Sequence, residues 1–157
     1  MTEPERGLES TPPPHGGDRD KWIAWANEMP ASQAMQLRCE DIEPGRAVLV
    51  LDRGPWPLNP NGAIHGGLVA ACADHVMAIA LIPMLEPGSM PATATLNSDF
   101  LRPALPPVTF EAVVDKCGRT MGFLTVTARD RNGKLAAKCH GTMPVDGSSR
   151  FLDDTPA

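Results

Sequence analysis

The 157-residue sequence predicts an α+β domain in which a curved antiparallel sheet wraps around one long central helix. Three observations predict this fold: a long apolar helical run over residues 66–82, two strand-like segments before it, and four strand-like segments after it. The run is apolar on almost every side, so it has to be buried. A sheet that curves around such a helix buries the apolar faces of both partners.

The individual elements follow from apolar periodicity and from turn residues. A short packing or lid helix capped by Asp18 is expected over residues 18–29. Strands are expected at 35–39, 47–51, 92–101, 108–116, 121–129 and 134–143. Glu43-Pro44-Gly45 predicts the turn between the first two strands, and Asn132-Gly133 predicts a tight hairpin between the last two.

The length suits one domain, which we place at residues 18–145. Residues 1–17 are rich in proline, glycine and charge, so we expect a disordered N-terminal tail. Residues 146–157 are polar and predict a second tail at the C-terminus.

Composition argues against several classes of partner. The formal net charge of −5 and the isoelectric point of about 5.3 disfavour binding to nucleic acid or to an anionic membrane. The N-terminus lacks the apolar run of a signal peptide, and we expect no segment of transmembrane length, so a cytoplasmic protein is predicted. The four cysteines show no metal-ligand spacing with the four histidines, and we expect reduced thiols and no metal.

Several catalytic signatures are missing, including G-x-S-x-G, G-x-x-x-x-G-K-[ST], G-x-G-x-x-G and H-E-x-x-H. What remains is a loop from Leu58 that delivers Gly66 and Gly67 to the start of the buried helix. Glycines there let a ligand approach bare backbone amides, and the helix dipole adds partial positive charge. Such a helix start can stabilise the oxyanion of an attacked carbonyl, although a tight loop-to-helix turn has the same appearance.

Asp74 and His75 are the only strongly polar side chains in the central helix. A buried carboxylate needs a partner, yet no Lys or Arg lies between Arg53 and Arg102, which favours a chemical role for Asp74. His75 points about 100° away from Asp74 and is interpreted as a packed or hydrogen-bonded core residue.

Two further residues of this region have competing interpretations. Cys72 stands three residues before His75, but without a third orienting group we interpret it as a core thiol. Asn59 either orients water or a carbonyl at a reaction centre, or forms an Asx turn before Pro60.

The pattern Asn59-x5-His65-Gly66-Gly67-x6-Asp74 resembles the signature of hot-dog fold acyl-CoA thioesterases of the phenylacetyl-CoA (PaaI-like) type. The stretch Leu96–Pro103 resembles the strand that follows the helix in that family, and the likeness covers roughly residues 34–144. The resemblance implies a hot-dog fold, tight homodimers and commonly homotetramers. It also implies hydrolysis of acyl-CoA between subunits, with no cofactor besides the CoA of the substrate.

Transferred residue by residue, the resemblance assigns a catalytic site. Asn59 and His65 support it, Gly66 supplies the oxyanion amide, and Asp74 acts as general base or nucleophile. Thr93 lies near the position where some members carry a Ser or Thr that positions water.

Residues that contact the CoA part of the substrate are expected at the helix start and in basic segments after the helix. These substrate-binding candidates are Gly67, Arg102, Gly118 and Arg119.

Two other functions compete with hydrolysis. A hot-dog enoyl-CoA hydratase pairs an Asp with a His about five residues later, and no Asp precedes His65 in that range. A non-catalytic acyl-CoA sensor would be expected to bring a DNA-reading module, and the acidic chain has no room for one.

Helix geometry predicts a site built from two chains. His65 and Asp74 are nine residues apart, which on a helix corresponds to about 13.5 Å and about 180° of rotation. The two residues therefore face opposite ways, and one thioester carbonyl cannot reach both the helix start and Asp74 of the same chain. We expect a two-fold dimer to bring Asp74 of one chain to the helix start of the other.

Overall fold

A computed structural model describes residues 11–145 of the chain. The elements in chain order are α1 Arg19–Glu28, α2 Pro30–Met35, β1 Leu37–Glu43, β2 Arg46–Leu51, α3 Gly66–Leu81, the 3-10 turn η1 Ile82–Met84, β3 Thr95–Phe100, β4 Val108–Cys117, β5 Met121–Arg129 and β6 Leu135–Pro144. They confirm the predicted series of one short helix, two strands, one long helix and four strands.

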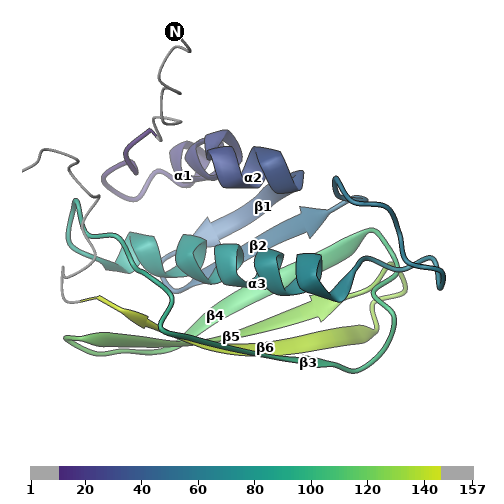
Figure 1. Cartoon of the computed structure of the whole chain (residues 1–157). Coiled ribbons are helices and arrows are strands. Elements are labelled where there is room, and N and C mark those ends of the chain that lie inside the picture. The colour runs from purple at the N-terminus through teal and green to yellow at the C-terminus, as the bar shows by residue number, and fades with distance from the viewer. Residues whose placement is uncertain (1–10, 146–157) are drawn as a thin grey trace, which may run out of the picture.

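The strands form one six-stranded sheet in the order β1-β2-β4-β5-β6-β3, and every neighbouring pair is antiparallel. Helix α3 lies along one face of this sheet, and α1 and α2 lie beside β1 beyond it (Figure 1). The α+β architecture of a sheet around a central helix is therefore confirmed. Because β3 joins the far side of β6, it forms an edge of the sheet.

The core lies between α3 and the sheet. The helix buries its apolar side chains against β2, β4, β5 and β6, and Val76, Met77 and Ile79 are fully enclosed. Gly141 on β6 lies where the Met77 side chain crosses the sheet, and a Cβ atom there would be 2.5 Å from the Met77 sulfur. The glycine thus allows the helix to lie this close to the strand.

By length and composition, the run Gly66–Met84 could cross a membrane, so the expectation that no segment reaches that length was wrong. More than half of this run, 56%, is buried inside the protein. The packing of α3 against four strands explains the apolar composition without a membrane, because a core helix covered on most sides needs the same residues.

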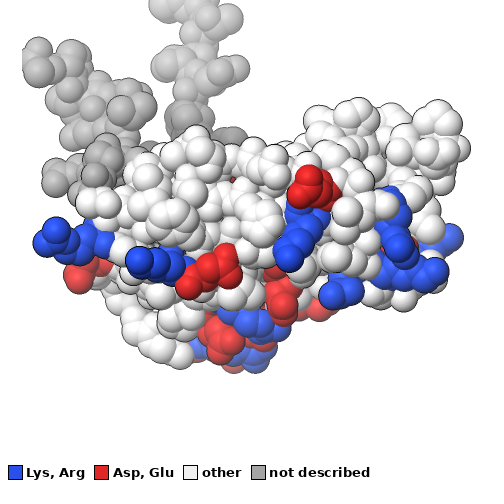
Figure 2. Space-filling view, turned by 90° about the horizontal axis from the view of Figure 1, so that it is seen from below, with Lys and Arg blue, Asp and Glu red and all other residues white. Residues whose placement is uncertain are grey.

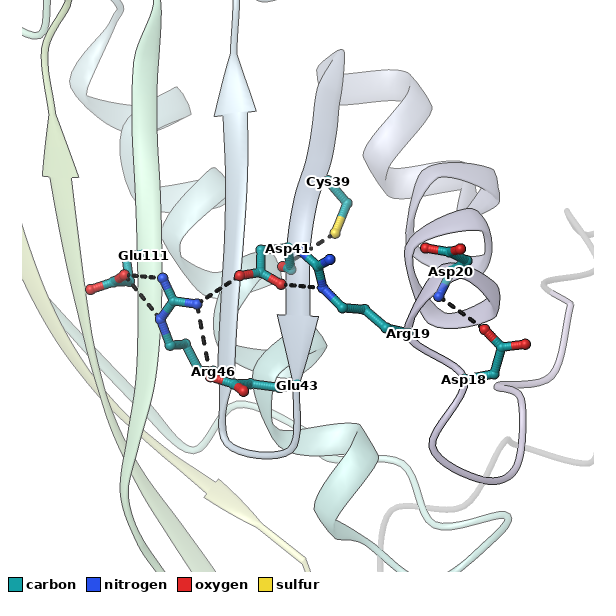
Figure 3. A network of polar contacts seen from close by, with 8 residues as sticks. All are labelled: Asp18, Arg19, Asp20, Cys39, Asp41, Glu43, Arg46 and Glu111. Atoms are coloured by element: carbon teal, nitrogen blue, oxygen red, sulfur yellow. Dashed lines mark hydrogen bonds and ion pairs between the residues drawn. The ribbon is translucent and has the colours of Figure 1, made fainter.

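A polar network joins α1 to the sheet (Figure 3). Arg46 on β2 contacts Glu111 on β4 at 2.7 Å and Asp41 on β1 at 2.9 Å, and Asp41 also accepts a hydrogen bond from Arg19 at 2.7 Å. These pairs are partly exposed, so each stabilises the fold only weakly. The Arg19–Asp41 pair links α1 to β1, whereas the Arg46 contacts join β1, β2 and β4.

The start of the domain differs from the expectation in one element. The helix α1 and its Asp18 cap are confirmed, since the Asp18 carboxylate accepts the backbone amides of Asp20 and Lys21. The short helix α2 was not predicted. It begins at Pro30, a residue suited to the first helical turn, but its six residues are too few for a periodic signal.

The two proposed tails stay predictions, because residues 1–10 and 146–157 lie outside the described residues. The segment 11–17 is described and contacts α1. The indole of Trp25 donates to the carbonyl of Thr11, and that of Trp22 donates to the carbonyl of Gly16.

The close approach of Met77 to β6 generates a stability prediction. We expect Gly141→Ala to lower the free energy of unfolding by about 1–3 kcal/mol, because the new methyl group overlaps the Met77 sulfur and lies 3.2 Å from the Thr95 carbonyl oxygen. Urea unfolding monitored by circular dichroism measures the change. Gly17→Ala is the control, because nothing lies within 4 Å of its added Cβ; equal stability of the two variants would contradict this packing.

Candidate functional site

The loop before α3 is held by the side chain of Asn59. Its Oδ1 accepts the backbone amides of Asn61 at 3.0 Å and Ala63 at 3.1 Å, and its own backbone amide donates to the Ala63 carbonyl. The Asx-turn interpretation is therefore confirmed for the oxygen. Within residues 11–145 the Nδ2 group makes no hydrogen bond, so Asn59 retains an amide donor beside the start of the helix.

His65 caps α3 through its ring. Nδ1 accepts the Gly67 amide at 3.0 Å, so the neutral ring carries its proton on Nε2. The indole of Trp56 packs edge-on against the imidazole, with ring centroids 5.5 Å apart. The capping bond leaves Nε2–H as a donor at the exposed helix start, and it occupies the Gly67 amide that was expected to contact substrate.

Gly66 presents a backbone amide at the first position of α3. This amide has no hydrogen-bond partner in the described part of the chain, as expected for the first turn of a helix. Gly66 lines a pocket of about 280 Å³ together with Asn59, Val69 and Phe100. The amide and the positive end of the helix dipole together suit an oxyanion or another anionic oxygen.

Asp74 lies in the middle of α3, half-buried, and its Oδ1 accepts a hydrogen bond of 2.5 Å from the hydroxyl of Thr93. Thr93 belongs to the exposed segment just before β3. Two residues of the predicted catalytic site are therefore in contact. No cation pairs with Asp74 in the described residues, so the carboxylate keeps its negative charge uncompensated.

His75 forms a second polar pair directly beside Asp74 in the sequence. Its Nε2 lies 2.7 Å from the hydroxyl of the fully buried Ser32 on α2, which confirms the hydrogen-bonded core interpretation. Burial lowers the pKa of His75 to about 4, against an opposing effect of the Asp74 charge. At neutral pH the ring is therefore uncharged.

The thiol of Cys72 is a core group. The side chain is fully buried, and burial raises the pKa of the thiol to about 12. A neutral, enclosed thiol is not a nucleophile, which confirms the interpretation made from the sequence.

The predicted catalytic residues fall into two groups. Asn59, His65 and Gly66 meet at the start of α3, whereas Asp74 and Thr93 lie further along the helix and line no part of the pocket at its start. Eight residues of helix between Gly66 and Asp74 correspond to about 12 Å and about 80° of rotation. Within one chain, one reacting carbonyl cannot touch both groups.

The predicted substrate-binding residues also separate. Arg102 lines the pocket that contains Gly66. Gly118 and Arg119 lie in the β4–β5 turn, next to the Cys117↔Gly122 pair, whereas the other end of these strands, at Thr109↔Arg129, leads toward the pocket. In one chain, Arg119 and Arg102 are thus at opposite ends of the sheet.

Two contributors were missed from the sequence. Phe100 is 55% exposed and its ring is the nearest group to Gly66, 3.4 Å from the position of a Cβ there. Ser32 contacts a histidine 43 residues away, and no local pattern announces such a contact. Between residues 11 and 145 no group of three His, Cys, Asp or Glu side chains lies close enough to hold a metal ion.

The chain is similar in sequence to known thioesterases and esterases. Residues 61–137, which contain α3, match the model of the thioesterase superfamily. A candidate esterase of Saccharolobus solfataricus is 27% identical over 109 residues, which cover 69% of this chain and 77% of that protein.

Solved structures share the fold. A thioesterase family protein of Silicibacter pomeroyi has a TM-score of 0.71 and 25% identity, covering 80% of this chain and 96% of that one. The E. coli PaaI protein of the phenylacetic acid degradation operon has a TM-score of 0.65 and 23% identity, covering 73% and 86%. A Streptococcus mutans protein bound to acetyl CoA has a TM-score of 0.62 and 21% identity, covering 69% and 87%. The hot-dog fold is confirmed.

The buried Ser32–His75 pair generates a prediction on pH. Between pH 6.5 and about 4, the unfolded chain protonates this histidine and the folded chain does not, so stability is complete above pH 6.5 and falls as the pH decreases. We expect a loss of up to about 3 kcal/mol by pH 4. Urea unfolding at several pH values measures it. His75→Gln, which keeps a partner for Ser32 without titrating, should reduce this slope; identical slopes in both proteins would contradict the assignment.

Proposed function

Because this chain belongs to the thioesterase superfamily and is a thioester hydrolase, we propose that it hydrolyses acyl-CoA to the free acid and CoA, with Asp74 as the catalytic carboxylate. The observation that carries the proposal is the Asp74–Thr93 pair. The half-buried carboxylate accepts a hydrogen bond from the Thr93 hydroxyl and has no cation beside it in the described residues. The S. mutans protein of the same fold, bound to acetyl CoA, supports a CoA thioester as the substrate.

The proposed chemistry uses two groups. The Gly66 amide and the helix dipole stabilise the negative charge that develops on the thioester oxygen, and Asn59 and His65 supply further donors beside it. In the general-base route, Asp74 takes a proton from water while the water oxygen attacks the carbonyl, and Thr93 fixes the carboxylate. The carbon–sulfur bond then breaks, and the CoA thiolate leaves and takes up a proton. In the nucleophilic route, Asp74 attacks the thioester carbonyl, the carbon–sulfur bond breaks and the CoA thiolate leaves, and water then hydrolyses the mixed anhydride to the free acid and the Asp74 carboxylate.

We further propose that each site contains Gly66 of one chain and Asp74 of its partner. The separation of about 12 Å between the two residues on α3 supports a second chain, since a transition state must contact both. A two-fold axis would place the carboxylate of each chain at the helix start of the other and so create two equivalent sites.

The surface around Asp74 supports such a partner. Helix α3 is enclosed on most sides, but Gly67, Ala71, Asp74 and Ala78 form one stripe that the chain leaves exposed or half-exposed. The edge strand β3 is exposed along nearly its whole length, including Leu96 and Phe100. An unpaired edge beside an uncovered face of an apolar helix favours association with a second copy.

A substitution of the carboxylate tests its role. We expect Asp74→Asn to lower kcat by about 100-fold or more, because the amide keeps the shape but neither accepts a proton from water nor attacks the carbonyl. Thiol release from a panel of short, medium, long and aromatic acyl-CoAs provides the measurement. Circular dichroism provides the control for folding, and near-normal turnover of a folded variant would refute the role of Asp74.

Thr93→Ser, which keeps the hydroxyl, should retain more activity than Thr93→Ala.

Mixing two inactive variants tests the shared site. Gly66→Val obstructs one half of the site and Asp74→Asn disables the other, so each protein alone should be inactive. Co-refolding makes half of the dimers hybrid, and each hybrid has one intact and one doubly damaged site. About one quarter of wild-type activity should therefore return. Mass spectrometry verifies subunit exchange; exchange without recovered activity would mean that each chain builds its own site.

A further inference from the structure

A second pocket continues from the one at the start of α3. It has a volume of about 480 Å³ and shares Asn61, Leu101, Arg102 and Pro103 with the Gly66 pocket. Its far side is formed by the β5–β6 turn, where Asp130, Asn132 and Lys134 line it. The two pockets thus form one continuous surface from the proposed oxyanion amide to the turn.

This end of the molecule is rich in positive charge. In Figure 2, Lys and Arg side chains gather at the right-hand end of the face, the end at which β5 turns into β6 in Figure 1. Arg102 and Lys134 are both exposed, and neither forms an ion pair within residues 11–145. By contrast, Arg19, Arg38 and Arg46 each contact a carboxylate. Two cations in one pocket therefore form no ion pair in the described part of the chain, and their charges act on the nearby Asp130 only at longer range.

The single carboxylate of this pocket is already engaged. Asp130 is buried, and its Oδ1 accepts the backbone amides of Asn132 at 2.8 Å and Lys134 at 3.0 Å. Asp130 thereby shapes the tight turn at Asn132-Gly133, in which Gly133 has a φ of +74°. The turn uses the backbone amide of Lys134, whereas its ammonium group makes no hydrogen bond or ion pair within residues 11–145.

We infer that Lys134 and Arg102 bind the phosphate groups of the CoA moiety, and that Lys134 is a substrate-binding residue of this thioesterase. The inference rests on the proposed function. CoA carries its phosphates at the end remote from the thiol, joined by the pantetheine arm. A substrate with its thioester at Gly66 and its arm along the shared wall would present these phosphates to an ammonium and a guanidinium, the two side chains best suited to them.

The geometry distinguishes Lys134 from the earlier candidate Arg119. Lys134 shares a pocket with Arg102, whereas Arg119 of the same chain lies at the opposite end of β4 and β5. Phosphate contacts at the β5–β6 turn would make acyl-CoA a better substrate than acyl-pantetheine, which has no phosphate.

Two substrates with the same acyl group test the inference. Acyl-pantetheine has the thioester and the arm of acyl-CoA but no phosphate. We expect Lys134→Ala and Arg102→Ala each to raise KM for acyl-CoA about tenfold with kcat nearly unchanged, and to leave KM for acyl-pantetheine unaltered. Lys138→Ala is the matched control, because this exposed lysine on β6 lines neither pocket and its loss changes the net charge equally.

Each result has one meaning. An equal rise of KM for both substrates would mean that Lys134 acts on the structure of the turn or near the thioester. No rise of KM for acyl-CoA would mean that the phosphates bind elsewhere. Either result overturns the inference, even though the protein still hydrolyses acyl-CoA. Failure of the wild-type protein to hydrolyse any acyl-CoA would instead refute the proposed function. Calorimetric titration with CoA itself needs no turnover. Binding should weaken about tenfold in Lys134→Ala relative to Lys138→Ala, and equal affinities would overturn the inference.

Discussion

The burial of α3 is the constraint on which the rest of the structure depends. Its residues are too apolar for water, so the sheet covers the helix, mainly through β2, β4, β5 and β6, and Gly141 allows close contact with Met77. The same packing fixes the two chemical groups on the helix. Gly66 is held at its first position and Asp74 two turns later, and a rigid helix cannot bring them closer. Core packing and the division of the site between two places thus have one cause.

The sheet does not cover α3 completely, and the uncovered part of the helix contains the proposed catalytic carboxylate. The uncovered stripe of α3 includes Asp74. Thr93 contacts Asp74 and lies just before the exposed edge strand β3 in the chain. A monomer would leave this apolar surface and the unpaired strand in water. An assembly that covers them would also remove water from around the carboxylate and strengthen its interactions with a substrate. Stability and catalysis would then favour the same contact.

The extent to which the sequence predicted the structure follows from the range of each interaction. The core helix and the strands are visible because apolar spacing and turn residues act locally, as do the Asp18 cap and the Asn132-Gly133 turn. The Ser32–His75 bond, the Phe100–Gly66 contact and the distance between Arg102 and Arg119 depend on strand register and on packing between distant segments. Lys134 carries no signal in the sequence, because a lysine after a turn is most often plain surface charge.

The neutral state of His75 bears directly on what Asp74 can do. If the imidazole were charged at neutral pH, a cation would adjoin the carboxylate along the helix and weaken it as a base or nucleophile. Burial against Ser32 prevents this, because it lowers the pKa of His75 to about 4. No Lys or Arg of the described residues forms an ion pair with Asp74. Asp74 therefore has the Thr93 hydroxyl as its close polar partner, which orients the carboxylate without neutralising it.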